Sequence, residues 1–259
     1  AGGSESDNHA IKGTYFAYKN KGRHIITTKV EHPAVLETAK DLKKFGAEVT
    51  FLGVDEYGEL DLNELERSIR PDTILVTIMY ANNETGVIFP IKEITKIVKR
   101  KNPETIVHTD AVQVAGKDKI DVIDLGVDLL SISGHKLYAP KGVGALYIRK
   151  GVRIERLISG GHQERNRRAG TENVASIVAF GEAARLAIDE IEEEKKRLQY
   201  LRDKLENGIL ERIPYVKLNG HKTNRLCNTT NLSFKYVEGE GILLSLDMVG
   251  IAASSGSAC

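Results

Sequence analysis

The sequence has no tryptophan, only two cysteines and six prolines, and no long uninterrupted hydrophobic run. Cys227 and Cys259 do not form a C-x-x-C pair, which argues against a disulfide framework or a zinc knuckle. No segment reaches the ~18 to 20 apolar residues of a membrane span, and the amino terminus lacks the basic and apolar pattern of a secretory signal. We therefore expect a cytoplasmic protein in a reducing environment, with no membrane association and no metal site.

Neither sign of charge is in excess, because Lys and Arg number 37 against 36 Asp and Glu, for a formal net charge of +1. This balance gives no electrostatic reason to expect nucleic acid or an anionic membrane as a partner. A chain of 259 residues with 41% hydrophobic side chains can bury a core without cross-links. The composition favours a globular protein that acts on a small molecule.

Apolar, β-branched segments alternate with amphipathic segments through the first part of the chain. The expected strands are His24–Thr28, Glu48–Val54, Thr73–Tyr80, Thr105–Asp110, Asp128–Ser133 and Gly144–Arg149. The expected helices are Ala34–Phe45, Asp61–Ile69 and Ile91–Arg100. This βαβ rhythm predicts an α/β fold with a mostly parallel sheet covered by helices.

The pattern changes after Gly170 to one long helical stretch, Val174–Ile209, whose dense charges at Asp189–Arg197 indicate a solvated face. Beyond it we expect a helix at Gly241–Val249 and strands at Val216–Leu218, Thr230–Phe234 and Gly250–Ala253. These elements suggest a smaller α+β C-terminal domain, with one domain at 1–190 and the second at 191–259. The chain begins at Ala1 and stops abruptly at Cys259, so we expect it to be truncated at both ends.

Lys136 lies in Ser133–Lys136, just beyond the carboxyl end of an apolar strand. Open α/β sheets bind their ligands at that edge. A lysine held there can form a Schiff base with an aldehyde. The alternative is an ordinary solvated loop lysine.

Asp110 lies in Val107–Gln113, again at the end of an expected strand. Pyridoxal phosphate needs such an acid, because a carboxylate beside the pyridine nitrogen keeps it protonated and lets the ring accept electrons. Taken alone, Asp110 could equally be a helix N-cap.

The segment Gly2–Asn8 precedes a helical run through Tyr18 and could bind a phosphate with free backbone N–H groups and a hydroxyl. The alternative is a capping box, with Ser4 as the cap and Asp7 three residues later.

These motifs occur in an order that resembles the cysteine desulfurases of the NifS/IscS family, which are class V aminotransferase-like enzymes of PLP fold type I. The matching segments are Gly2–Ser4, Glu31–Pro33, Asn82–Gly86, His108–Asp110, Ser133–Lys136, Arg168–Asn173 and Ser254–Cys259. The last segment is similar to the mobile loop that carries the active-site cysteine. The resemblance implies a PLP-dependent transferase large domain and covers essentially the whole chain.

The resemblance also implies roles for individual residues. Lys136 would hold pyridoxal 5'-phosphate, Asp110 would pair with its pyridine nitrogen, Gln113 would contact the ring hydroxyl, and His32 would stack on the ring and move protons. The phosphate would be bound by Gly3, Ser4, Ser133 and His135. Thr171 would reach the phosphate of a neighbouring subunit in a homodimer, and Asn83 would lie near the ring and the substrate carboxylate.

The implied reaction is removal of sulfur from L-cysteine, which yields L-alanine and a persulfide on Cys259 for a sulfur acceptor or an iron-sulfur scaffold protein. Cys259 could instead be an incidental thiol, and Cys227 is expected to be a semi-buried structural cysteine. Ser4 replaces the family's usual Thr but keeps the hydroxyl. The arginine that clamps the substrate carboxylate in the family lies beyond the cysteine and is not in this sequence. Selenocysteine lyase, another class V enzyme and an inactive truncated scaffold remain alternatives.

Overall fold

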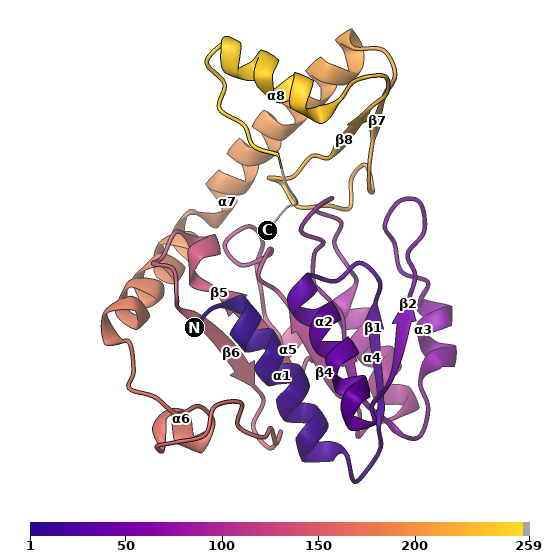
Figure 1. Ribbon diagram of the computed structural model, residues 1–259, viewed down its shortest axis with the longest axis vertical. Coiled ribbons are helices and arrows are strands. Elements are labelled where there is room, and N and C mark those ends of the chain that lie inside the picture. Colours follow the sequence, from indigo (N-terminus) through magenta and orange to yellow (C-terminus); the bar gives the residue numbers. More distant parts are fainter. Residues whose placement is uncertain (256–259) are drawn as a thin grey trace.

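The computed structural model describes residues 1–255 and contains a six-stranded sheet of order β2-β1-β3-β4-β5-β6 (Figure 1). The strands are β1 His24–Thr28, β2 Glu48–Leu52, β3 Thr73–Thr77, β4 Ile106–Asp110, β5 Leu129–Ser133 and β6 Gly144–Ile148. The first five are parallel, and β6 pairs antiparallel with β5. The predicted mostly parallel sheet is confirmed.

Helices cover both faces of this sheet (Figure 1). The helices of this part of the chain are α1 Gly3–Tyr18, α2 Pro33–Leu42, η1 Lys43–Phe45, α3 Leu62–Ser68, α4 Ile91–Lys101, α5 Val122–Leu125, η2 Gly134–Leu137 and α6 Gln163–Asn166, of which α1, α2, α3, α4 and α5 pack on the sheet. Successive strand residues point to opposite faces. Accordingly, Ile25 and Leu75 pack with α1 and α2, whereas Ile26 and Val76 pack with α3, α4 and α5. The central strands are therefore buried on both sides.

A second, smaller group of elements lies beyond the sheet, at the far end of the long helix α7 Val174–Arg212 (Figure 1). It consists of the antiparallel strands β7 Val216–Leu218 and β8 Leu232–Phe234 and the helix α8 Gly239–Met248. Phe180 of α7 packs against Leu137 near the sheet, whereas Glu206 of the same helix binds Arg225 in the smaller part. Position 190 falls inside α7, and the division into 1–190 and 191–259 stays a prediction.

Two sequence-based expectations differ from the structure. Gly250–Ala253 is not a strand, because the chain turns at Gly250, with φ of 81°, and continues exposed without a strand beside it among the described residues. Helix α1 begins at Gly3, so Ser4 lies inside the helix and its side chain does not cap it. The capping-box alternative is therefore wrong. None of the helices in residues 1–255 combines the length and apolarity needed to cross a membrane.

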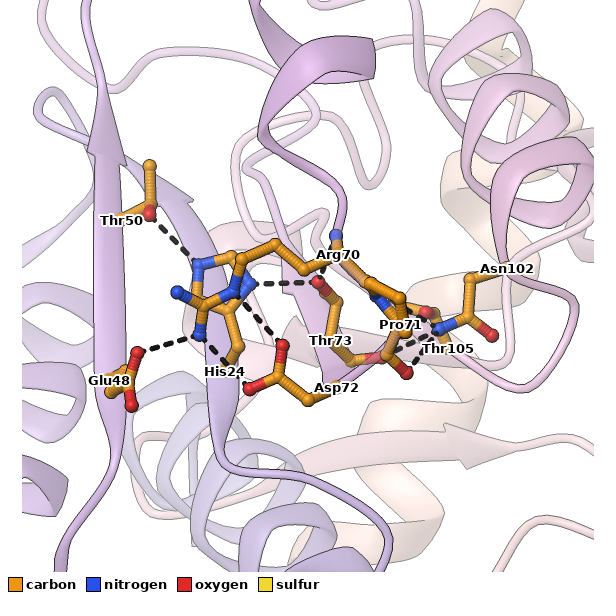
Figure 2. A network of polar contacts seen from close by, with 9 residues as sticks. All are labelled: His24, Glu48, Thr50, Arg70, Pro71, Asp72, Thr73, Asn102 and Thr105. Atoms are coloured by element: carbon orange, nitrogen blue, oxygen red, sulfur yellow. Dashed lines mark hydrogen bonds and ion pairs between the residues drawn. The ribbon is translucent and has the colours of Figure 1, made fainter.

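Polar side chains join the amino ends of β1, β2 and β3, as Figure 2 shows. His24 bonds through Nδ1 to Thr73 Oγ1 and through Nε2 to Thr50 Oγ1, both at 2.8 Å. The Arg70 backbone N–H donates to Thr73 Oγ1 at 2.8 Å, and its guanidinium donates to Glu48 at 2.7 Å. These contacts fix the strand starts at one edge of the sheet. The carboxyl ends of the strands lie at the opposite edge, where ligands bind in open α/β sheets.

Candidate active site

A cavity of about 310 Å³ lies at the carboxyl ends of β4 and β5. The predicted site residues that line it are Gly3, Ser4, His32, Asn83, Asp110, Gln113, Ser133, His135 and Lys136. They come from α1, the start of α2, the loop after β3, the turn after β4, and the segment after β5. The structure thus brings together residues that are far apart in the sequence.

Lys136 is held by η2, the short turn that follows β5 directly. The turn is fixed because Gly134 N–H donates to Val143 O at 2.9 Å and Leu137 is buried against Phe180. A Cβ at Gly134 would lie 2.7 Å from Val143 Cγ1, so this position requires glycine. Lys136 therefore reaches the cavity from a backbone that is anchored on both sides.

Asp110 ends β4 and is 7% exposed. Its carboxylate accepts a hydrogen bond from Val112 N–H at 2.9 Å, and its backbone carbonyl accepts from Tyr80 N–H at 2.8 Å. The carboxylate thus caps the turn that follows while it also faces the cavity. Burial raises the pKa of Asp110 to about 6, against the lowering effects of Val112, Asp7 and Lys136. Above that pH, the group carries a negative charge.

The amino end of α1 lies beside Ser133 and forms another part of the cavity wall. The helix has Gly2 at its N-cap with no side-chain cap, and its first backbone bond runs from Ser6 N–H to Gly2 O at 3.1 Å. The N–H groups at the preceding positions of the first turn have no acceptor within the helix, and the helix dipole favours an anion there. A Cβ at Gly3 would lie 2.9 Å from Val112 Cγ2, so glycine lets α1 pack closely against the turn after β4.

His32 caps α2, because its Nδ1 accepts a hydrogen bond from Ala34 N–H at 3.1 Å. The neutral ring therefore carries its proton on Nε2. Burial, followed by the charge of Lys136, lowers the pKa of His32. The ring is consequently neutral near pH 7 and can stack on an aromatic ligand or exchange a proton at Nε2.

A hydrogen bond joins Ser133 and His135, with Ser133 Oγ 2.8 Å from His135 Nδ1. Asn83 is positioned by its neighbour Asn82, whose amide donates to Val30 O at 3.0 Å and whose Oδ1 accepts from the Glu84 and Thr85 backbone. These contacts hold polar groups at both ends of the cavity.

Thr171 does not line this cavity. It lies on a larger one, of about 640 Å³, between α1, β6 and the segment before α7. That segment is tied to α1 because Arg168 donates to both Glu5 oxygens, at 2.8 and 3.2 Å. The two cavities share the lining residues Ala1, Gly2 and Gly142. A role of Thr171 across a subunit interface stays a prediction.

The structure describes one of the two cysteines. Cys259, the predicted nucleophile, lies outside the described residues. Cys227, expected to be semi-buried, is only 4% exposed, with Sγ 3.9 Å from Lys117 O, and burial raises the pKa of its thiol. It stays protonated and acts as a core residue.

Asp7 was missed as a site residue by the sequence analysis, which assigned it only to a cap. It lines the cavity, is 1% exposed, and lies beside Asp110. Its spacing of four residues from Gly3 places both on one face of α1. That spacing from Gly3 is the feature of the sequence that indicates Asp7 as a residue of the same site.

The whole chain, residues 1–259, matches the model of the family described as aminotransferase class V. It is 56% identical over 257 residues to a cysteine desulfurase of Nostoc sp., covering 99% of this chain and 64% of that protein. It is 56% identical over 259 residues to the cysteine desulfurase IscS of Dictyoglomus turgidum, covering 100% of this chain and 65% of that protein. The chain thus spans slightly less than two thirds of the length of these relatives.

Solved structures show the same similarity. A NifS-like protein superimposes with a TM-score of 0.94 at 43% identity, covering 98% of this chain and 69% of that one. SspA in complex with cysteine superimposes with a TM-score of 0.82 at 35% identity, covering 99% and 71%. The matched enzymes form a PLP-dependent group. The chain therefore belongs to the class V aminotransferase family, in its NifS/IscS cysteine desulfurase branch.

Proposed function

We propose that this chain carries the catalytic machinery of a pyridoxal-phosphate-dependent cysteine desulfurase. The observation that supports this most directly is that Lys136 and Asp110 line one cavity with the uncapped amino end of α1. The relatives named cysteine desulfurase and the neighbour bound to cysteine support the same substrate.

The cavity fits pyridoxal phosphate in each of its three polar parts. Lys136 offers an amine for the aldehyde, Asp110 a carboxylate for the pyridine nitrogen, and the start of α1 with Ser4, Ser133 and His135 a set of donors for the phosphate. Gln113 and His32 line the same cavity, where Gln113 would contact the ring hydroxyl and His32 would stack on the ring. The cofactor, when bound, supplies an electron sink for the bond that breaks at the substrate Cα.

Side chains of the cavity move protons and carry charge around the cofactor. We assign Lys136 as the base at the substrate Cα, because its amine lines the cavity and would be placed to take up the proton that leaves that carbon. Asp110 keeps a negative charge beside the ring nitrogen, and His32 exchanges a proton at Nε2. Asn83 lies on the cavity wall, where it can contact the substrate carboxylate.

Cys259 is the sulfur acceptor in this proposal. Its thiolate attacks the substrate sulfur, the Cβ–S bond breaks, and a proton replaces sulfur on the carbon, so the products are L-alanine and a Cys259 persulfide. A thiol nucleophile requires a reducing compartment such as the cytosol. The persulfide then passes to an acceptor or iron-sulfur scaffold protein, and we expect the enzyme to act as a homodimer with Thr171 serving the neighbouring site.

Absorption spectra of the protein with pyridoxal phosphate test the proposal. A band that forms on reconstitution, changes on addition of L-cysteine, and is lost in Lys136→Ala is the expected result. Lys141→Ala is the matched control, because Lys141 is an exposed lysine a few residues along the same segment. A protein that folds but does not take up the cofactor contradicts the proposal.

A further inference from the structure

Two carboxyl groups form part of the same cavity wall. Asp7 on α1 is 1% exposed, and Asp110 at the end of β4 is 7% exposed. Their side chains lie within hydrogen-bonding reach of each other. Two hydrogen-bonded carboxyl groups on one cavity wall, both shielded from water, cannot both be ionised without a large electrostatic cost.

The surrounding groups do not neutralise a second negative charge. His108 Nε2 is 3.8 Å from Asp7 Oδ1, but its ring nitrogens bond to the Thr77 hydroxyl at 2.8 Å and the Ser131 hydroxyl at 3.0 Å. Burial lowers the pKa of His108 to about 3, so this ring is neutral near pH 7.

The remaining ionisable neighbours, Lys136 and Glu31, supply no positive charge to Asp7 itself. The positive charge of Lys136 lowers the pKa of Asp110. Glu31 is a third buried carboxyl, whose pKa is raised by burial to about 8. Asp7 therefore faces an anion and a neutral imidazole. Among the interactions that act on it within the described part of the chain, the Ser131 hydrogen bond favours its ionised form.

We propose that Asp7 keeps its proton and donates it in a hydrogen bond to Asp110, so that Asp110 alone carries the charge that faces the ring nitrogen of the cofactor. Asp7 is then a positioning residue for Asp110. This inference rests on the proposed function, because it concerns the same cofactor site.

The hydrogen bonding of Asp7 agrees with a neutral acid. Among the described residues, Asp7 Oδ1 is buried and has no hydrogen-bond partner. An unpaired carbonyl oxygen of a protonated acid is far less costly than an unpaired carboxylate oxygen. Burial, and next the charge of Asp110, raise the pKa of Asp7 well above its ordinary value. The proton of Asp7 in turn stabilises the ionised form of Asp110.

Infrared spectroscopy of the cofactor-free protein near pH 7 tests the protonation state. The C=O stretch of a protonated carboxylic acid should lose one component in Asp7→Asn. It should remain complete in Thr14→Val, a matched control on the same helix whose buried hydroxyl has no hydrogen-bond partner among the described residues. Glu31→Gln identifies the component of the other neutral carboxyl. An unchanged protonated-acid region in Asp7→Asn overturns the proposal.

Cofactor binding tests the positioning role. Asp7→Asn keeps an N–H donor toward Asp110, whereas Asp7→Leu has a similar size and no donor. We expect Asp7→Leu to bind pyridoxal phosphate at least about tenfold more weakly, which is the effect of one lost hydrogen bond to a charged group. Asp7→Asn should retain most of the affinity. Equal affinities of the two variants, in proteins with the parental circular dichroism, overturn the proposal.

The two experiments separate this inference from the proposed function. If the parent chain does not bind pyridoxal phosphate, the proposed function fails, and the infrared result still decides whether Asp7 is protonated. If Asp7→Leu does not fold, the comparison of Asp7→Asn with the parent in the infrared decides the inference.

Discussion

Lys136 and Asp110 face one cavity from the carboxyl ends of two adjacent parallel strands, β5 and β4. Adjacent parallel strands end at the same edge of a sheet, so the turns that follow them place the amine and the carboxylate together. The charge of Lys136 also lowers the pKa of Asp110. The pair is thus electrostatically linked before any ligand enters.

Asp110→Asn should leave the fold intact and impair the chemistry. The amide oxygen can still accept the Val112 N–H, so the turn is kept. The negative charge beside the ring nitrogen is lost, and we expect the L-cysteine-induced change in cofactor absorption to slow at least about a hundredfold. Stopped-flow absorption measures this rate. Asp124→Asn, an exposed acid on α5, is the control and should react as the parent does. A rate for Asp110→Asn above about a tenth of the parental rate would contradict the assignment.

Thr73→Val should destabilise the amino edge of the sheet. Thr73 Oγ1 bonds to His24 Nδ1 and to Arg70 N–H, and it is 2% exposed (Figure 2). Its loss leaves these two groups without a partner, at a cost of about 1–3 kcal/mol in the free energy of unfolding. Denaturant titration measures the change.

Thr95→Val is the matched control for that experiment. Thr95 is also a buried threonine, but among the described residues its hydroxyl has no hydrogen-bond partner. Replacing the hydroxyl by a methyl group there removes a buried, unpaired polar atom, so the stability should stay constant or rise. An equal loss in both variants would show that the Thr73 contacts do not stabilise the fold.

His108 should make the stability depend on pH. Burial lowers its pKa in the folded chain to about 3, whereas an unfolded histidine titrates near about 6.5. Above about 6.5 neither state takes up the proton, and the stability contributed by this group is complete. Below it the unfolded state alone binds the proton, so the free energy of unfolding falls by up to about 1.4 kcal/mol per pH unit until the folded pKa is reached.

Unfolding titrations at about pH 7 and about pH 5 test this linkage. The loss on acidification should be smaller in His108→Gln than in the parent, because the titrating group is gone. His162→Gln, which replaces an exposed histidine, should keep the parental loss. An identical pH dependence in His108→Gln and the parent would sink the prediction.

The sequence predicted the central sheet well for a physical reason. Strands buried on both faces, such as His24–Thr28 and Thr73–Thr77, are continuous apolar or β-branched runs that differ from the amphipathic helices between them. Strand ends were less accurate, because β3 ends at Thr77 although the apolar run continues to Tyr80 and still hydrogen-bonds to β4 through its backbone. Gly250–Ala253 is a short run of small and apolar residues, and such a run does not supply a neighbouring strand.

The candidate site was predictable where a motif follows a strand, as for Asp110 and Lys136. Asp7 was not, because an acid in the first turns of a helix is usually a cap or a solvated side chain. Its role depends on the packing of α1 against β4 and β5, which buries it beside Asp110. The spacing from Gly3 places Asp7 on the same face of α1, but it does not indicate which distant segment packs against that face.

Cys259→Ser separates cofactor binding from sulfur transfer. The cofactor residues line a cavity at the sheet edge, so the variant should keep the absorption band and its change with L-cysteine. It should release no sulfur from L-cysteine in the presence of a thiol reductant, because a serine hydroxyl cannot accept sulfur as a persulfide. Cys227→Ala is the matched control and should retain sulfur release, since Cys227 is a buried core residue away from the cavity lining. Continued sulfur release by Cys259→Ser would favour a lyase that does not use a protein thiol, such as one acting on selenocysteine, over a cysteine desulfurase.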